Sequence, residues 1–224
     1  MILKNSVGII IPAYNESNSI SKVILESLHF GTVIVVNDGS NDKTKDISES
    51  SGAIVISHTI NQGYDQSILT GLGEALRLGL KFAITIDADG QHNSKDLSLI
   101  LKMFGEEDYD LVIGARKKPA RFGEFLFNFY FKLKYNVHDI LCGLKGYKLE
   151  KIKNINFNKK AENSVGTEIP LLLLRSKYKV GELPIEINLR IGKSKYGSLF
   201  QSNVLIILAL FNVMRYDFLK FLIR

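Results

Sequence analysis

The sequence predicts an α/β fold in which helices cover both faces of a mostly parallel sheet. Four short runs rich in Val and Ile have the continuous apolar character of strands buried on both faces: residues 7–11, 32–36, 53–56 and 82–86. The segments between them carry apolar residues at the spacing of amphipathic helices: residues 19–28, 43–50 and 65–80. This alternation indicates parallel strands joined by right-handed crossovers.

The length and composition indicate one globular unit. A chain of 224 residues can build one sizeable core and is too short for two ordinary domains with a linker. The single cysteine, Cys142, excludes an internal disulfide framework, so we expect a reducing, cytoplasmic compartment. Residues 1–6 run directly into the first expected strand without a separate apolar region, so the sequence does not predict secretion.

The charge is concentrated in one part of the chain. The formal net charge is +6, and residues 115–160 hold twelve Lys and Arg against three acids, Glu124, Asp139 and Glu150. A basic field of this kind attracts phosphates, whether on a nucleotide, a lipid headgroup or a nucleic acid. A solvated basic surface is the other interpretation of the same residues.

Three of the expected strands end in polar clusters, at residues 12–16, 37–40 and 87–92. In a parallel sheet these ends converge on the edge where ligands bind. Asp87 and Asp89 are two residues apart in extended backbone, so their carboxylates can share a divalent cation with diphosphate oxygens. Alone the pair is more typical of a turn, but Asp38 and Glu16 at the same edge suit a base or ribose and favour a nucleotide-diphosphate site.

The polar clusters also carry a family resemblance. Ile-Pro-Ala-Tyr-Asn-Glu, Val-Val-Asn-Asp-Gly-Ser, Asn61-Gln62-Gly63 and Asp-Ala-Asp-Gly-Gln-His resemble, in this order, the motifs of family 2 glycosyltransferases. Later segments resemble the dolichyl-phosphate mannose synthase and polyprenyl-phosphate glycosyltransferase branch of that family: residues 114–116, 139–143 and 190–196. The resemblance covers residues 7 to 197. Asn37 and Cys142 depart from it, because Asp and Ser are frequent at these two positions.

The resemblance implies a Rossmann-like GT-A fold, a nucleotide-sugar donor, inversion at the anomeric carbon and Mg or Mn as the cofactor. It implies a metal site made by Asp87, Asp89 and Gln91. The residues that it implies for the nucleotide are Pro12, Tyr14, Glu16, Asp38, Gly63, Asp87 and Ala88.

The acceptor is expected to be a lipid phosphate, because a phosphate anion needs no base and the second half of the chain is basic. By resemblance, Asp89, Arg116 and Asp139 are the catalytic candidates, and Asp139 either orients the acceptor or acts as base for a hydroxyl. The candidates for acceptor or diphosphate contacts are Arg121, Arg190, Ser194 and Lys195. Glycines on either side of residues 193–196 suggest a lid over the diphosphate.

A membrane surface is the second expected partner. Aromatic and basic residues alternate at 121–135, which suits an interfacial helix or a core helix with basic edges. We expect a transferase domain over residues 1–198 and an amphipathic helix over 199–224. Residues 199–214 lack charge but fall short of the roughly 20 apolar residues of a membrane span. The sequence therefore predicts peripheral association at the cytoplasmic face of a membrane.

Other functions fit the sequence less well. A nucleic acid is disfavoured as a partner, because strand-end carboxylates repel phosphate unless a metal intervenes. A nucleotidyltransferase should carry a Gly-rich basic loop after its first strand, where this chain has Pro12-Ala13-Tyr14-Asn15-Glu16. Two alternatives stay open: transfer to a saccharide hydroxyl in cell-surface glycan synthesis, and a non-catalytic nucleotide-binding scaffold at a membrane.

Overall fold

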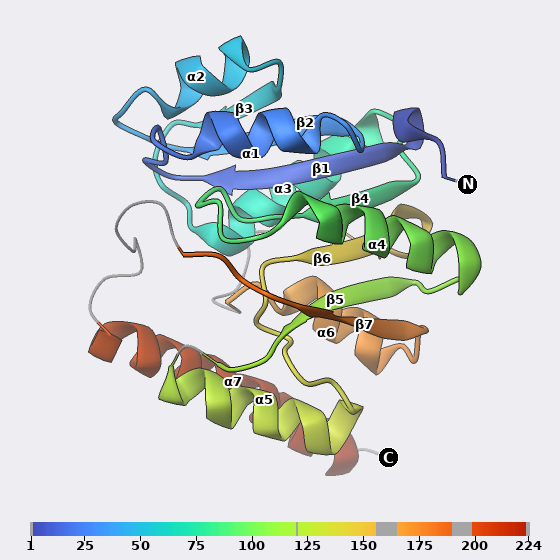
Figure 1. Cartoon of the computed structure of the whole chain (residues 1–224). Coiled ribbons are helices and arrows are strands. Elements are labelled where there is room, and N and C mark those ends of the chain that lie inside the picture. The colour runs from blue at the N-terminus through green and yellow to red at the C-terminus, as the bar shows by residue number, and fades with distance from the viewer. Residues whose placement is uncertain (1, 120, 156–164, 190–198, 223–224) are drawn as a thin grey trace.

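The computed structural model describes residues 2–119, 121–155, 165–189 and 199–222, and it has the expected α/β architecture (Figure 1). The strands are β1 (Val7–Ala13), β2 (Thr32–Asp38), β3 (Ile54–His58), β4 (Phe82–Thr85), β5 (Leu111–Arg116), β6 (Lys145–Lys148) and β7 (Val180–Ile185). The α-helices are α1 (Ile20–Ser27), α2 (Thr44–Ser50), α3 (Tyr64–Arg77), α4 (Ser94–Glu106), α5 (Phe122–Tyr135), α6 (Glu168–Arg175) and α7 (Leu199–Leu222). Short 3-10 turns cover Lys4–Ser6 and Leu149–Lys151.

The strands form one sheet of order β3-β2-β1-β4-β6-β5-β7. All pairings are parallel except those of β6, which is antiparallel to both β4 and β5. The strand order reverses between β1 and β4, and such a switch point opens a crevice at the carboxyl ends of the strands. The predicted mostly parallel sheet is therefore confirmed, and its ligand edge lies at the ends of β1 and β4.

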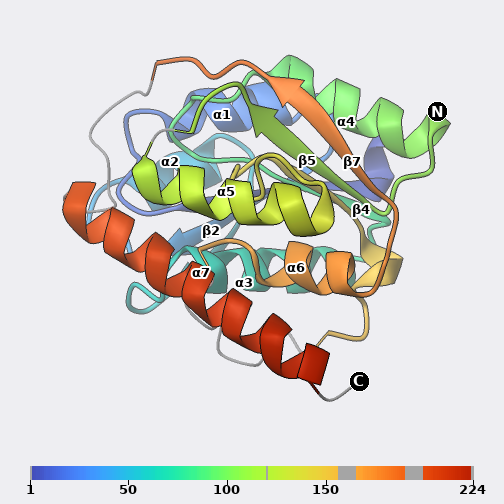
Figure 2. The same ribbon diagram turned by 90° about the horizontal axis from the view of Figure 1, so that it is seen from below.

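Helices cover both faces of the sheet, as predicted (Figure 2). Alternate residues of the central strands point to opposite faces, so Ile10 enters one core while Ile9 and Ile11 enter the other. The core on the side of Ile10 is built with α3, α5, α6 and α7. The opposite core is built with α1 and α4.

The second half of the chain contains three strands that the sequence did not predict. In β6 only four residues form the strand, and two of them are lysines, one of which, Lys145, is buried. Strand β7 contains Pro184, which is tolerated because β7 lies at the sheet edge beside β5 alone. Helix α6 begins at Glu168, an acid that suits the positive end of the helix dipole.

Helices α5 and α7 pack side by side at the β7 end of the sheet (Figures 1 and 2). In α5 the core interpretation of the aromatic segment is confirmed for one side of the helix, where Phe127 and Phe131 are fully buried. Phe125 and Phe129 are exposed, and the interfacial interpretation of that side stays a prediction. Helix α7 runs from Leu199 to Leu222, beyond the uncharged stretch of residues 199–214.

The sequence-based judgement that the C-terminal segment is too short for a membrane span is therefore corrected. Its stretch Ser202–Leu219 is long and apolar enough to cross a membrane by length and composition. Core helices of soluble proteins pass the same test, so this property alone does not establish a span.

A buried carboxylate ties α7 to its neighbours. Asp217 accepts hydrogen bonds from Tyr130 and Tyr135 of α5, each at 2.8 Å, and from Arg175 of α6 at 2.9 Å. Lys134 Nζ lies 2.8 Å from the same carboxylate. We call this group the Asp217 clamp; it joins three helices through one side chain that is almost inaccessible to solvent.

The packing of α3 on β1 depends on Gly71, which leads to a first prediction. A Cβ at this position would lie 2.3 Å from Ile10 Cγ2. Gly71→Ala should lower the free energy of unfolding by about 1–3 kcal/mol because the core is overpacked. The matched control is Gly105→Ala in α4, where the nearest atom to the new Cβ is 3.9 Å away. Urea unfolding should show no loss of unfolding free energy for Gly105→Ala. Equal stability of the two variants would contradict the close packing of Gly71 against Ile10.

The Asp217 clamp predicts a pH-dependent contribution to stability. Burial acts to raise the pKa of Asp217, but hydrogen bonds from Lys134, Tyr130 and Tyr135 outweigh it and hold the pKa below its usual value. Such a carboxyl stabilises the fold above its unfolded-state pKa of about 4, and the contribution is lost as pH falls through the folded-state value. Asp217→Asn should therefore cost about 1–3 kcal/mol at neutral pH. Urea titrations should show that the difference in unfolding free energy between the unsubstituted protein and Asp217→Asn shrinks below about pH 4. A difference that stays constant with pH would contradict a stabilising role of the ionised Asp217 carboxylate.

Candidate functional site

A cavity of about 460 Å³ opens at the carboxyl edge of the sheet. It gathers most of the residues that the sequence predicted, from segments far apart in the chain. Those lining it are Pro12, Tyr14, Glu16, Asp38, Gly63, Asp87, Ala88, Asp89, Gln91, Arg116 and Arg121. Arg190, Ser194, Lys195 and the proposed lid lie outside the described residues.

The loops after β1 and β2 are bonded to each other. The Asn15 N–H donates to Ser40 Oγ at 2.9 Å, and the Asn41 N–H donates back to Asn15 Oδ1 at 2.8 Å. The Glu16 N–H donates to Thr44 Oγ1 at 2.8 Å. Gly39 adopts a positive φ of 69° against the backbone of residues 60–61, where a Cβ would approach Asn61 N to 2.7 Å. The first two motifs and the loop after β3 thus form one wall of the cavity.

Asp38 organises this wall. Its Oδ1 accepts from the Gln62 N–H at 2.8 Å and from His58 Nδ1 at 2.7 Å, and its Oδ2 accepts from the Gly63 N–H at 2.8 Å. His58 Nε2 is in turn 3.0 Å from Thr70 Oγ1 of α3. Each carboxylate oxygen can accept two hydrogen bonds, so Oδ2 retains capacity for a ligand. Asp38 therefore shapes the loop as well as lining the cavity.

Asp87 follows β4 and lies among hydrogen-bond donors. Tyr64 Oη donates to its Oδ1 at 3.1 Å, and His92 Nε2 lies 3.4 Å from its Oδ2. Burial acts to raise the pKa of Asp87, but the contacts with His92 and Tyr64 prevail and hold the pKa below its usual value. A Cβ at Gly143 would stand 2.3 Å from both carboxylate oxygens. Asp87 is thus an anion whose position requires a glycine at residue 143.

Asp89 and Gln91 form the turn that follows. Asp89 Oδ1 accepts from the Gln91 N–H at 3.0 Å. The Gln91 carbonyl accepts from the Asn188 N–H at 2.7 Å, and Gln91 Nε2 is 3.4 Å from the Asn188 carbonyl. This turn is therefore tied to the chain that leaves β7.

The oxygen ligands at this turn suit a hard divalent cation. Within the described part of the chain, no three His, Cys, Asp or Glu side chains come together as a self-sufficient metal site. Mg²⁺ needs no such cluster, because it usually takes one or two protein carboxylates and completes its shell with water and substrate phosphates. Asp87 and Asp89 fit that pattern.

The insertion of β6 places a buried lysine next to the carboxylates. Lys145 begins β6, is almost fully buried, and donates from Nζ to the Cys142 carbonyl. Burial lowers the pKa of Lys145, while the charges of Asp87 and Asp139 act to raise it. Cys142 is buried as well, which raises the pKa of its thiol to about 12. The thiol is thus protonated and packs against Gly114.

Arg116, at the end of β5, is held between two acids. Its Nε and Nη2 bond Asp139 at 2.6 and 2.9 Å, and Nη2 lies 3.2 Å from Glu124. Burial opposes the charge, but Asp139 and Glu124 raise the pKa of Arg116 above its already high value. Glu124 also bonds Arg121 at 2.7 Å. Two permanent cations therefore stand at the cavity wall, each paired with a carboxylate, and one of these carboxylates, Glu124, lines the cavity as well.

Asp139 has no free acceptor position. Besides the Arg116 side chain, it accepts from the Arg116 N–H at 3.1 Å and from Asn128 Nδ2 at 3.0 Å. These four bonds fill the four lone-pair sites of a carboxylate. Of the two roles considered for Asp139, the geometry favours orientation of Arg116 over proton abstraction.

Part of the cavity lining is apolar, which the sequence did not predict. We call this part the apolar wall; it consists of Leu141, Val165, Ile187, Leu205 and Ile206, the last two from α7. The neighbouring Gly166 N–H donates to Asp65 at 2.6 Å, which fixes this wall to the start of α3 beside Tyr64. Tyr64, Lys145 and the apolar wall carry no local motif and become visible only through the fold.

The comparisons with known proteins agree with this geometry. The profile of glycosyl transferase family 2 matches residues 8–156. An uncharacterised protein of Methanocaldococcus jannaschii is 34% identical, covering 83% of this chain and 82% of its own. The UDP-N-acetylglucosamine–dolichyl-phosphate N-acetylglucosaminyltransferase of Methanococcus voltae is 28% identical, covering 80% of this chain and 84% of its own.

The fold is also shared with a solved structure. Glucosyl-3-phosphoglycerate synthase of Mycobacterium tuberculosis, crystallised with Mn²⁺, UDP-glucose and phosphoglyceric acid, superposes with a TM-score of 0.70 at 15% identity, covering 92% of this chain and 79% of its own. That similarity shows the GT-A fold, and the match of the family profile over more than half of the chain shows the family. The chain belongs to glycosyl transferase family 2.

Proposed function

We propose that this chain moves a sugar from a UDP- or GDP-linked donor to a polyprenyl or dolichyl phosphate, with inversion and with Mg or Mn, at the cytoplasmic face of a membrane. One observation carries the proposal: a single cavity joins the nucleotide and aspartate motifs to an arginine pair and an apolar wall shared with α7. The lipid-phosphate acceptor in the name of the Methanococcus voltae relative supports the same reading.

At the donor end, the wall built around Asp38 and Glu16 receives the nucleoside, and Asp87 and Asp89 are the residues that would hold a divalent cation. When bound, the cation would supply positive charge that neutralises the diphosphate as it leaves. Tyr64 and His92 keep the Asp87 carboxylate in place and ionised. The Mn²⁺ and UDP-glucose bound by glucosyl-3-phosphoglycerate synthase support this arrangement.

At the acceptor end, Arg116 and Arg121 bind the phosphate and the apolar wall receives the first part of the lipid. A phosphate oxygen is already anionic near neutral pH, so it can attack the anomeric carbon without a general base. The filled lone pairs of Asp139 support a phosphate acceptor over a saccharide hydroxyl. Asp139 is then a positioning residue, and Arg116 is the group that touches the acceptor.

The direct test is transfer of sugar to a short-chain polyprenyl phosphate. We expect a lipid-linked product with one of the UDP- or GDP-sugars in the presence of Mn²⁺, and none after chelation with EDTA. Asp89→Ala should abolish the Mn²⁺-dependent thermal stabilisation by UDP or GDP. Stabilisation that is unchanged in Asp89→Ala would refute the metal site. Product with a saccharide acceptor alone would identify a hydroxyl transferase, and nucleotide binding without transfer would indicate a scaffold.

The contact between Gly143 and Asp87 gives a second test of the metal site. Gly143→Ala should fold, since the atoms it meets are the end of a side chain, but it should displace the Asp87 carboxylate. We expect the affinity for Mn²⁺ with UDP or GDP to fall about 10- to 100-fold. Gly105→Ala serves as the glycine control away from the cavity. Affinities can be measured by titration calorimetry. Equal Mn²⁺ affinity in Gly143→Ala and Gly105→Ala would exclude a role for Asp87 in binding the metal.

A further inference from the structure

We infer that the cavity selects a uridine diphosphate over a guanosine diphosphate, and that Asn61 is the residue that determines this specificity. The loop after β3 places one hydrogen-bond donor, the Asn61 amide, beside one acceptor, Asp38 Oδ2. The inference rests on the proposed function for placing the nucleoside at the wall built around Asp38. It adds the choice between two bases that the proposed function treats alike.

Asp38 has one acceptor position left for a base. A carboxylate can accept about four hydrogen bonds, two at each oxygen. His58 Nδ1 and the Gln62 N–H both donate to Oδ1, while the Gly63 N–H donates to Oδ2. The carboxylate is buried and is held by three separate groups, so it cannot turn to present Oδ1 to the cavity. The position that remains is on Oδ2.

Asn61 presents a donor beside this acceptor. Its Oδ1 accepts the Gly63 N–H at 3.1 Å, the same N–H that Asp38 Oδ2 accepts at 2.8 Å. The shared N–H holds the amide next to the carboxylate, and both side chains line the cavity. The NH₂ group of Asn61 forms no hydrogen bond with the residues that the structure describes, so it can donate to a ligand.

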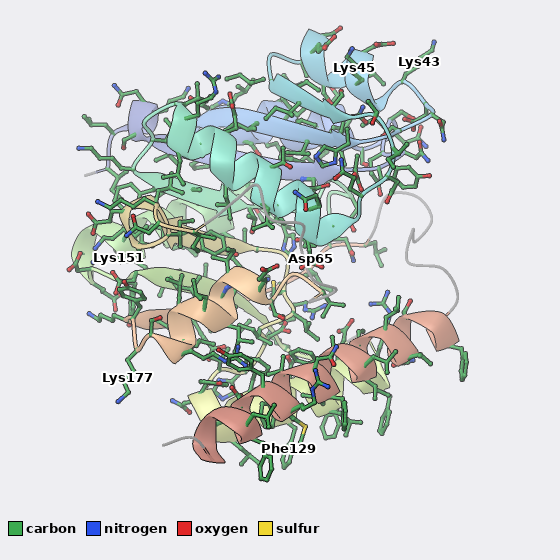
Figure 3. All side chains as sticks on the ribbon, turned by 180° about the vertical axis from the view of Figure 1, so that it is seen from behind. Lys43, Lys45, Asp65, Phe129, Lys151 and Lys177 are labelled. Carbon is green, nitrogen blue, oxygen red and sulfur yellow. The ribbon has the colours of Figure 1, made fainter. Side chains whose placement is uncertain are left out.

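The backbone around Asn61 is fixed from two sides. A Cβ on Gly39 would lie 2.7 Å from Asn61 N, so the loop after β2 packs directly against it. On the other side the loop runs into α3 at Tyr64. Figure 3 shows Asp65, two residues after Gly63, at this end of α3 and facing α6. The donor and the acceptor are therefore in place before a nucleotide binds.

Uracil matches this pair of groups. Its hydrogen-bonding edge has one N–H with a carbonyl on either side. The N–H donates to Asp38 Oδ2, and one of the carbonyls accepts from the Asn61 amide. The second carbonyl needs no protein donor, because an oxygen acceptor is tolerated without a partner more readily than an N–H donor.

Guanine does not match it. Its edge has an N–H and an NH₂ group side by side, and a carboxylate pairs with both only when each of its oxygens accepts one. Asp38 Oδ1 has no position left, so one guanine donor stays unpaired against the wall. An unpaired donor in a binding site costs a large part of the affinity.

Titration calorimetry of the full chain with UDP and with GDP, each with Mn²⁺, tests the selectivity. We expect the Kd for GDP to be about 10- to 100-fold higher than the Kd for UDP. Equal affinities, or tighter binding of GDP, would overturn the inference.

Asn61→Asp tests the residue that determines the choice. The new carboxylate still accepts the Gly63 N–H, but it replaces the donor with a second acceptor. Two adjacent acceptors suit the two donors of guanine and face a carbonyl of uracil with an anion. We expect the ratio of the two Kd values, GDP over UDP, to fall about tenfold or more, with GDP bound at least as tightly as by the unsubstituted protein.

Thr59→Asp is the matched control for charge. It adds the same charge two residues earlier in the loop, at an exposed position that does not line the cavity, and should keep the ratio unchanged. Pyrophosphate with Mn²⁺ should bind both variants equally, because it lacks the base. Equal loss of UDP and GDP affinity in Asn61→Asp would indicate damage to the loop and overturn the role of Asn61.

These measurements separate the inference from the proposed function, since none of them requires sugar transfer. A preference for GDP together with transfer to polyprenyl phosphate would overturn the inference and leave the proposed function standing. A preference for UDP without transfer to any acceptor would do the reverse.

Discussion

The reversed strand β6 is the constraint on which the site depends. In an all-parallel sheet, the segment that precedes a strand lies at the edge opposite the ligands. Because β6 runs antiparallel between β4 and β5, its beginning lies at the same edge as their ends. That reversal brings Gly143 against Asp87 and Asp139 against Arg116. The pairing of residues that function together therefore follows from strand direction.

The same reversal sets the charge balance of the cavity. Carboxylates that bind a cation repel one another and the diphosphate unless positive groups lie near. Arg116 and Arg121 supply two such groups at the cavity wall. Glu124, which also lines the cavity, and Asp139 hold these arginines in place. Opposite charges thus alternate through the site, and each member has a partner in the protein before any ligand arrives.

The fold up to β4 could be predicted from the sequence because its strands are short apolar runs and its helices are amphipathic, whereas α4 was not predicted. The expected strands at 7–11 and 32–36 fall within β1 and β2. The second half could not, because β6 is short and rich in lysine and β7 contains a proline. Their strand character comes from their neighbours and not from local propensity.

For the site, short motifs predicted the residues that end strands, since a motif records several chemical groups at fixed spacing. The roles were harder to predict than the positions. Asp38 uses most of its acceptor positions to bind His58 and the backbone N–H groups of residues 62–63. Asp139 uses all of its acceptor positions to bind Arg116 and Asn128. Such use depends on contacts between distant segments, which one sequence does not reveal.

The position of α7, with one side on the cavity and the other exposed, gives the proposed lipid acceptor a kinetic consequence. An enzyme that acts at a bilayer meets a lipid acceptor by diffusion in two dimensions, while a water-soluble donor arrives in three. Under the proposed function, the effective concentration of acceptor is set by its surface density and not by the volume of the cell. The proposal then requires only the phosphate of the acceptor, and not its whole lipid tail, to reach Arg116 and Arg121.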